Sequence, residues 1–131
     1  MNELTVEWLR KAEGDYATTG RETRARRHPN YDAACFHAQQ AAEKYLKALL
    51  QEHGRPVPRT HSLVELLELC LPLDASFELI RDLLILLDVY SVRYRYPGES
   101  ADRDEARTAY RAIRRVRDFV RQKLGVSPAV P

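Results

Sequence analysis

The sequence has little of what defines several common protein classes. Among its 131 residues are only five glycines, seven prolines and two cysteines, Cys35 and Cys70, which have no CxxC or metal-type spacing. So few glycines and prolines argue against a fold of many strands and tight turns. The most apolar run, residues 79–92, is too short to span a bilayer and includes Arg81, Asp82 and Asp88. We expect both cysteines to be reduced and buried on helices, unless the fold brings them together as a disulfide.

Charge and hydrophobicity indicate a compact globular protein. The chain is 44% hydrophobic and 31% charged, which excludes disorder, and its length suits one domain, expected over residues 1–125 with a flexible tail at 126–131. A net charge of +2 argues against a general coating of nucleic acid. The balance is uneven, because residues 60–92 hold one basic and six acidic side chains and residues 93–131 hold ten and five. The acidic start Met1-Asn2-Glu3 is unlike a signal peptide, so a cytoplasmic location is expected.

Hydrophobic periodicity predicts helices between four groups of helix-breaking residues. The breaks lie at residues 28–30, 54–58, 71–74 and 97–98. They separate helical patterns at about 3–26, 31–53, 60–71, 74–96 and 100–124, and none of these segments shows the alternation of a strand. Thr60 or Ser62 can start the third segment, where Ser62 and Glu65 have capping-box spacing, and Asp74 can cap the fourth. The sequence therefore predicts an all-α fold, an up-and-down bundle of four long helices plus a short one.

The fourth of these predicted helices is apolar around most of its circumference. Its hydrophobic residues, from Phe77 to Val92, cover more than one face. We expect it to be either the central helix of the bundle or a helix that also contacts a second subunit.

The second predicted helix carries a row of polar side chains beside its apolar face. His37, Gln40, Lys44 and Lys47 follow one another at i, i+3, i+7 and i+10. An imidazole, an amide and two ammonium groups in such a row suit an anionic ligand or hydrogen bonds to a partner. The alternative is a solvated polar face, in which Glu43 and Lys47 form an ordinary i,i+4 ion pair.

Two further clusters offer donors and aromatic rings. In the segment Arg93-Tyr94-Arg95-Tyr96, guanidinium forks for phosphate alternate with rings that can stack on a base. The alternative is that the arginines neutralise the helix C-terminus while the tyrosines pack at the edge of the core. His61 lies at or just inside a predicted helix start, where it either takes part in a site or packs locally within a capping segment.

The last predicted helix has an excess of arginine on or near one side, formed by Arg103, Arg107, Arg111, Arg114 and Arg121. Such a stripe suits the phosphates of a nucleic acid, and the alternative is a solvated face paired with neighbouring carboxylates. The four histidines have no HxxxH or HExxH spacing, so no metal site is predicted. A P-loop, a GxGxxG loop and a GxSxG elbow are all missing, and no catalytic nucleophile is assigned.

Four segments in this order resemble the HEPN domain family (higher eukaryotes and prokaryotes nucleotide-binding). They are Trp8-Leu9 with Ala12 and Asp15-Tyr16, the run FHAQQAAEKYLKALL within residues 34–50, Thr60-His61-Ser62-Leu63, and Arg95-Tyr96-Pro97. The resemblance extends over about residues 8–124. It implies a helical bundle similar to the C-terminal domain of kanamycin nucleotidyltransferase, and it implies a homodimer. Many bacterial members of the family are encoded beside a minimal nucleotidyltransferase and act with it as a toxin–antitoxin pair.

Catalytic members of the family are metal-independent ribonucleases with an Arg-x4-6-His motif near the start of the last long helix. Here Arg93 and Arg95 are near that place, but no histidine follows His61. The literal match, Arg21 with His28, lies in the first interhelical connection instead.

The leading hypothesis is therefore a non-catalytic homodimer that needs no cofactor and binds an ATP-like nucleotide, a minimal nucleotidyltransferase, or both. The residues expected to bind the nucleotide or partner are His37, Gln40, Lys44, Lys47, His61, Arg93, Tyr94, Arg95 and Tyr96. The alternative is a ribonuclease toxin in which His37 or His61 supplies the acid. A third possibility is a purely structural dimer, whose polar row makes hydrogen bonds only within the bundle.

Overall fold

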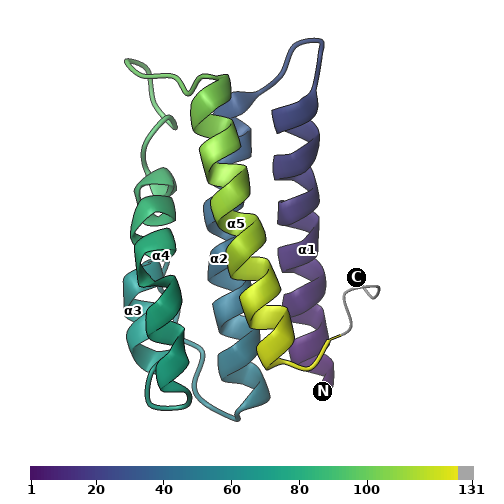
Figure 1. Cartoon of the computed structure of the whole chain (residues 1–131), viewed down its shortest axis with the longest axis vertical. Coiled ribbons are helices and arrows are strands. Elements are labelled where there is room, and N and C mark those ends of the chain that lie inside the picture. The colour runs from purple at the N-terminus through teal and green to yellow at the C-terminus, as the bar shows by residue number, and fades with distance from the viewer. Residues whose placement is uncertain (127–131) are drawn as a thin grey trace.

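The computed structural model describes residues 1–126, and in that range the chain is helical with no strand (Figure 1). The α-helices are α1 (Glu3–Arg24), α2 (Tyr31–Glu52), α3 (Leu63–Cys70), α4 (Arg81–Asp88) and α5 (Arg103–Lys123). Two 3₁₀ segments, η1 (Ala75–Ile80) and η2 (Val89–Ser91), flank α4. The predicted all-α fold is confirmed.

The helix α2 is the centre of the bundle. It packs against α1 along most of its length, and α5 lies across it, while the shorter α3 and α4 cover its other edge (Figure 1). Alanines at positions 34, 38, 41, 42 and 48 are buried and let neighbouring helices approach closely, while Tyr45, Leu46 and Leu49 fill the core. One expectation was that the apolar segment 74–96 forms the central helix. The central helix is α2 instead, because its small residues allow closer packing.

Side-chain caps fix where the helices begin. In each case a side-chain oxygen accepts a hydrogen bond from the backbone three residues on, or two residues on at η1. The caps are Asn2 for α1, Asn30 for α2, Ser62 for α3, Asp74 for η1 and Asp102 for α5. Of the two starts predicted for α3, the structure has Ser62, and the predicted cap at Asp74 is confirmed. Because Asp102 is its cap, α5 begins at Arg103, later than the expected position near 100.

The expected long helix over 74–96 is shorter and less regular than predicted. Only Arg81–Asp88 is α-helical, and the helical segment ends at Ser91, so residues 93–96 lie on an irregular connection. The hydroxyl of Ser91 donates to the carbonyl of Asp88 at 3.1 Å, which offers the backbone an alternative to another helical turn. Tyr94 adopts a positive φ of 68°, and Pro97 disfavours the helical conformation of the residue before it. The bundle therefore has three long helices, and α4 with its two flanking 3₁₀ segments takes the place of the expected fourth.

The expected tail at 126–131 lies outside the described residues except for Val126. Its backbone N–H donates to the carbonyl of Arg121 at 3.0 Å, and its side chain packs against the core.

Both cysteines are free and buried, Cys35 on α2 and Cys70 at the end of α3. Burial raises the pKa of each thiol to about 12. We expect a chromogenic disulfide reagent at pH 8 to react with the native protein more than about a thousandfold more slowly than with a free cysteine, because the thiolate is the nucleophile. Both thiols should titrate at once in denaturant. Rapid reaction of either thiol before unfolding would contradict the buried placement.

Candidate functional site

Two buried carboxylates organise the polar row of α2. Asp15 projects from α1 toward α2, where its two oxygens contact His37 Nδ1 at 2.8 Å and Lys44 Nζ at 2.5 Å. The Asp15 side chain is only 11% exposed, whereas His37 is 33% exposed and Lys44 22%. One carboxylate of α1 therefore contacts two of the four predicted members of the row.

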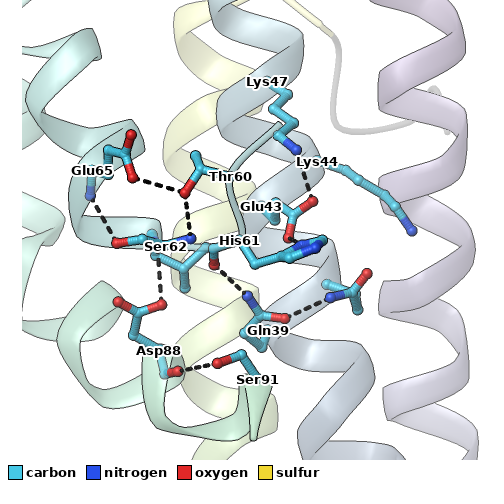
Figure 2. Close-up of polar contacts among 12 residues, drawn as sticks. Gln39, Glu43, Lys44, Lys47, Thr60, His61, Ser62, Glu65, Asp88 and Ser91 are labelled. Atoms are coloured by element: carbon cyan, nitrogen blue, oxygen red, sulfur yellow. Dashed lines mark hydrogen bonds and ion pairs between the residues drawn. The ribbon is translucent and has the colours of Figure 1, made fainter. Parts of the chain in front are cut away.

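The second carboxylate, Glu43, lies on α2 itself and is more deeply buried. Its Oε2 accepts from Lys47 Nζ at 2.9 Å, and its Oε1 is 2.9 Å from His61 Nδ1 (Figure 2). The Lys47 ammonium is also 5.6 Å from the centre of the Trp8 ring on α1. With side chains 7% and 5% exposed, Lys47 and Glu43 form an interior ion pair, whereas the ring of His61 is 73% exposed.

The amide of Gln39 ties the loop that follows α2 back onto that helix. Its Nε2 donates to the carbonyl of His61 at 2.9 Å, and its Oε1 accepts from Gln40 at 2.7 Å (Figure 2). The segment 53–62 is thus attached to α2 through both the backbone and the ring of His61. Gln40, the remaining member of the predicted row, acts by orienting Gln39.

The same loop is also held by α4. Asp88 accepts a hydrogen bond from the backbone N–H of Leu63 at 3.0 Å, beside the Ser62 cap (Figure 2). Thr60 adds to this turn, because its hydroxyl accepts from the N–H of Ser62 at 3.1 Å and donates to Glu65 at 2.8 Å. The Thr60-His61-Ser62 segment is therefore a junction where α2, α3 and α4 meet.

The connection after η2 brings Arg95, but not Arg93, to the polar row. The Arg95 guanidinium lies 5.1 Å from the centre of the Phe36 ring, and that ring packs edge-on against His37 with centroids 5.6 Å apart. Arg93 instead donates to Glu99 at 3.3 Å. The hydroxyl of Tyr94 donates to Glu105 at 3.2 Å. Arg95 and His37 thus flank one aromatic ring although 58 positions separate them in the chain.

Tyr94 and Tyr96 have different environments. The ring of Tyr94 stacks on Tyr90 with centroids 6.1 Å apart, and burial together with the charge of Glu105 raises the pKa of its hydroxyl. Tyr96 is 66% exposed. Of the two tyrosines predicted to contact a ligand, only Tyr96 presents its ring to solvent.

The arginines of α5 divide into two groups. Arg117 and Arg121 form ion pairs with Glu13 of α1 at 3.0 and 2.7 Å, and Arg121 is buried. Its expected place on one stripe with Arg103 and Arg107 is therefore wrong, because Glu13 holds it at the interface of α1 and α5. The remaining members, Arg103, Arg107, Arg111 and Arg114, are exposed.

Sequence reasoning did not include Asp15, Glu43 and Gln39 among the site residues. Each is a polar residue that is buried among apolar neighbours on its helix: Asp15 follows Leu9 and Ala12, and Gln39 and Glu43 follow Cys35. A charged or amide side chain inside an apolar stripe was the available signal, since such a group must have a partner.

Across residues 1–126, no three His, Cys, Asp or Glu side chains are grouped as metal ligands, and no helix is long and apolar enough to cross a membrane.

The fold and the polar row define a small α-helical bundle with counterparts among solved structures. The protein TT1696 from Thermus thermophilus is 32% identical with a TM-score of 0.77, and the match covers 94% of this chain and 99% of that one. ST0689, an archaeal HEPN homologue, is 25% identical with a TM-score of 0.75, and the match covers 95% and 99%. No match was found among curated protein sequences.

The sequence model of the HEPN domain matches residues 5–123, nearly the whole chain. The chain therefore belongs to the HEPN domain family, as the four sequence segments indicated.

The interior ion pair makes a prediction about stability. Replacing Glu43→Ala leaves the Lys47 ammonium buried without its carboxylate, so we expect the free energy of unfolding to fall by about 3–5 kcal/mol. The double variant Glu43→Leu/Lys47→Met removes both charges and should recover most of that loss. Chemical denaturation monitored by circular dichroism measures both values.

The matched control is Glu7→Ala on the exposed side of α1, which should change stability by less than about 0.5 kcal/mol. If Glu43→Ala were as mild as Glu7→Ala, the pair would not be the interior contact described here.

Proposed function

We propose that the protein is a non-catalytic HEPN module that acts in the cytoplasm as a homodimer and binds a minimal nucleotidyltransferase in a toxin–antitoxin-like pair. The observation that carries this proposal is an apolar surface along η1, α4, η2 and the following connection. Its exposed members are Leu79, Ile85, Val89, Val92 and Tyr96, with exposed fractions between 48% and 76%.

This apolar surface suits a protein contact better than solvent. Ile85 and Val89 are one helical turn apart, and Val92 and Tyr96 continue the exposed apolar positions beyond η2. Large apolar side chains left exposed along one segment are typical of a protein interface. A second copy of the chain is the proposed occupant, in keeping with the apolar character that this segment already has in the sequence.

The polar row supports partner binding more than nucleotide binding. Lys47 and Lys44 already have carboxylate partners in Glu43 and Asp15, so an ATP-like nucleotide would have to compete with those ion pairs for both ammonium groups. The groups left for a partner are the exposed ring of His61, Arg95 and Tyr96. Arg95 directly precedes Tyr96, which belongs to the apolar surface, and His61 lies on the loop that Asp88 of α4 holds.

The first experiment tests the homodimer and its partner together. We expect the purified protein to sediment as a dimer and the double variant Ile85→Glu/Val89→Glu to sediment as a monomer, because two buried carboxylates at the interface would be unpaired. The control Leu4→Glu, an exposed apolar residue of α1, should remain dimeric. Co-expression with the nucleotidyltransferase of a neighbouring gene should give a stable complex on size exclusion. A monomeric wild type that forms no complex would contradict the proposal.

One observation favours the alternative, a ribonuclease. Arg95 and His37 both lie against the ring of Phe36, and Asp15 holds Nδ1 of His37, which leaves Nε2 for proton transfer. An arginine that stabilises a phosphorane and a histidine oriented by a carboxylate are the groups such a reaction requires. In this candidate they come together in space rather than in an Arg-x4-6-His motif.

Expression of the protein alone in bacteria separates the two functions. The non-catalytic module should leave growth and cellular RNA unchanged. A ribonuclease should arrest growth and cleave RNA, and His37→Ala or Arg95→Ala should each lower the cleavage rate by a factor of about 100 or more. The control Arg10→Ala removes one exposed positive charge from α1, and this variant should cleave RNA at the wild-type rate. Cleavage that survives both His37→Ala and Arg95→Ala would contradict the ribonuclease alternative.

A further inference from the structure

Arginine dominates an open pocket of about 500 Å³ between the end of α1 and the first half of α5. Its polar lining residues are Thr23, Arg24, Arg26, Arg103, Arg107 and Tyr110. No acidic residue lines it, and no member of the α2 row contributes to it. The pocket is therefore separate from the candidate site described above.

The four guanidinium groups of this pocket have no carboxylate within 4.0 Å among residues 1–126. The acidic groups nearby in the chain have other roles: Glu22 accepts from the backbone N–H of Asn30 at 2.8 Å, and Asp102 caps α5. By contrast, Arg117 and Arg121 farther along α5 share Glu13. Four like charges around one pocket repel one another, and a bound anion would relieve that repulsion.

Packing around Tyr110 holds part of the pocket in place. Arg24 donates to the Tyr110 hydroxyl at 3.1 Å, and Tyr16, two turns earlier on the same face of α1, stacks on Tyr110 with ring centroids 5.6 Å apart. Gly20 makes room for this contact, because a Cβ there would lie 2.9 Å from Arg24 Nη1 and 3.3 Å from the Tyr110 hydroxyl. Burial raises the pKa of Tyr110, but hydrogen bonds with Tyr16, Arg114 and Arg24 outweigh it, so the net pKa is lowered. The surroundings of this hydroxyl favour negative charge.

We propose that this arginine pocket binds an oligophosphate chain, either free or as the phosphate tail of a nucleotide. One planar guanidinium group can bind two phosphate oxygens at once. Several guanidinium groups are needed to match the successive charges of a phosphate chain. A volume of about 500 Å³ is in the range of small-ligand pockets. The proposal goes beyond the proposed function, which uses neither α1 nor the start of α5.

The test uses the full chain and calorimetric titration at low salt with tripolyphosphate, ATP and AMP. We expect tripolyphosphate and ATP to bind and AMP to bind at least about tenfold more weakly, because it presents one phosphate. The variant Arg26→Ala/Arg107→Ala removes two guanidinium groups that make no hydrogen bond within residues 1–126, and it should weaken tripolyphosphate binding about tenfold or more. The control Arg10→Ala/Arg115→Ala makes the same change in net charge away from the pocket and should bind within about twofold of the wild type.

The outcomes distinguish the sources of the phosphate chain. Equal affinity for tripolyphosphate and ATP supports the free chain, and tighter binding of ATP supports a nucleotide tail. The proposal is overturned if tripolyphosphate does not bind, or if the two double variants weaken it equally, since that would mean a general charge effect. It is also overturned if a single-stranded RNA without terminal phosphates displaces tripolyphosphate at lower concentration, because the site would then recognise a nucleic acid backbone.

Discussion

The buried carboxylate of Glu43 is the constraint on which much of the structure depends. A charge in the interior must be paired, and the two partners of Glu43 come from different parts of the chain: Lys47 one turn along α2, and His61 from the loop before α3. The contact of His61 with Glu43 holds this loop against the surface of α2. Ser62 and Asp88 then cap and anchor the start of α3 from two sides. The position of the α3–α4 pair beside α2 follows from these contacts.

The same constraint separates the surfaces of the protein by chemistry. Asp15 and Glu43 form ion pairs with Lys44 and Lys47, so the polar row of α2 holds the bundle together. Near that row, the side chains of His61 and Arg95 are exposed. The apolar surface around Ile85 and Val89 has no partner within the described chain. Four guanidinium groups with no carboxylate within 4.0 Å among residues 1–126 gather at the α1–α5 end, in the arginine pocket. The two proposals therefore place a protein contact on one surface of the bundle and an anion site on another.

Local pattern was enough to predict most of the fold, and the site depended on contacts that local pattern does not contain. Periodicity and the caps at Ser62 and Asp74 located the helices, and the polar row of α2 was recognised by its spacing. The pairing of Glu43 with Lys47 was also visible as an i,i+4 spacing. The contacts of Asp15 and His61 were not, because Asp15 and His37 are 22 residues apart and Glu43 and His61 are 18 apart. The length of the fourth helix was overestimated, since the apolar content of residues 74–96 outweighed the breaking effects near Ser91 and Pro97. Apolar composition also favoured that segment as the central helix, whereas close packing selects the alanine-rich α2.

The arrangement of the long helices has a consequence for the order of folding. The contacts of α1 with α2 join neighbours in the sequence across a short connection, so they cost little loop-closure entropy. Those of α1 with α5 join residues far apart in the sequence, from 86 positions for Arg24 with Tyr110 to 108 for Glu13 with Arg121. We therefore expect the α1–α2 hairpin to form before α5 docks. During synthesis, the hairpin would leave the ribosome well before α5 was made, with the α5-facing side of Tyr45 and its neighbours open to other molecules.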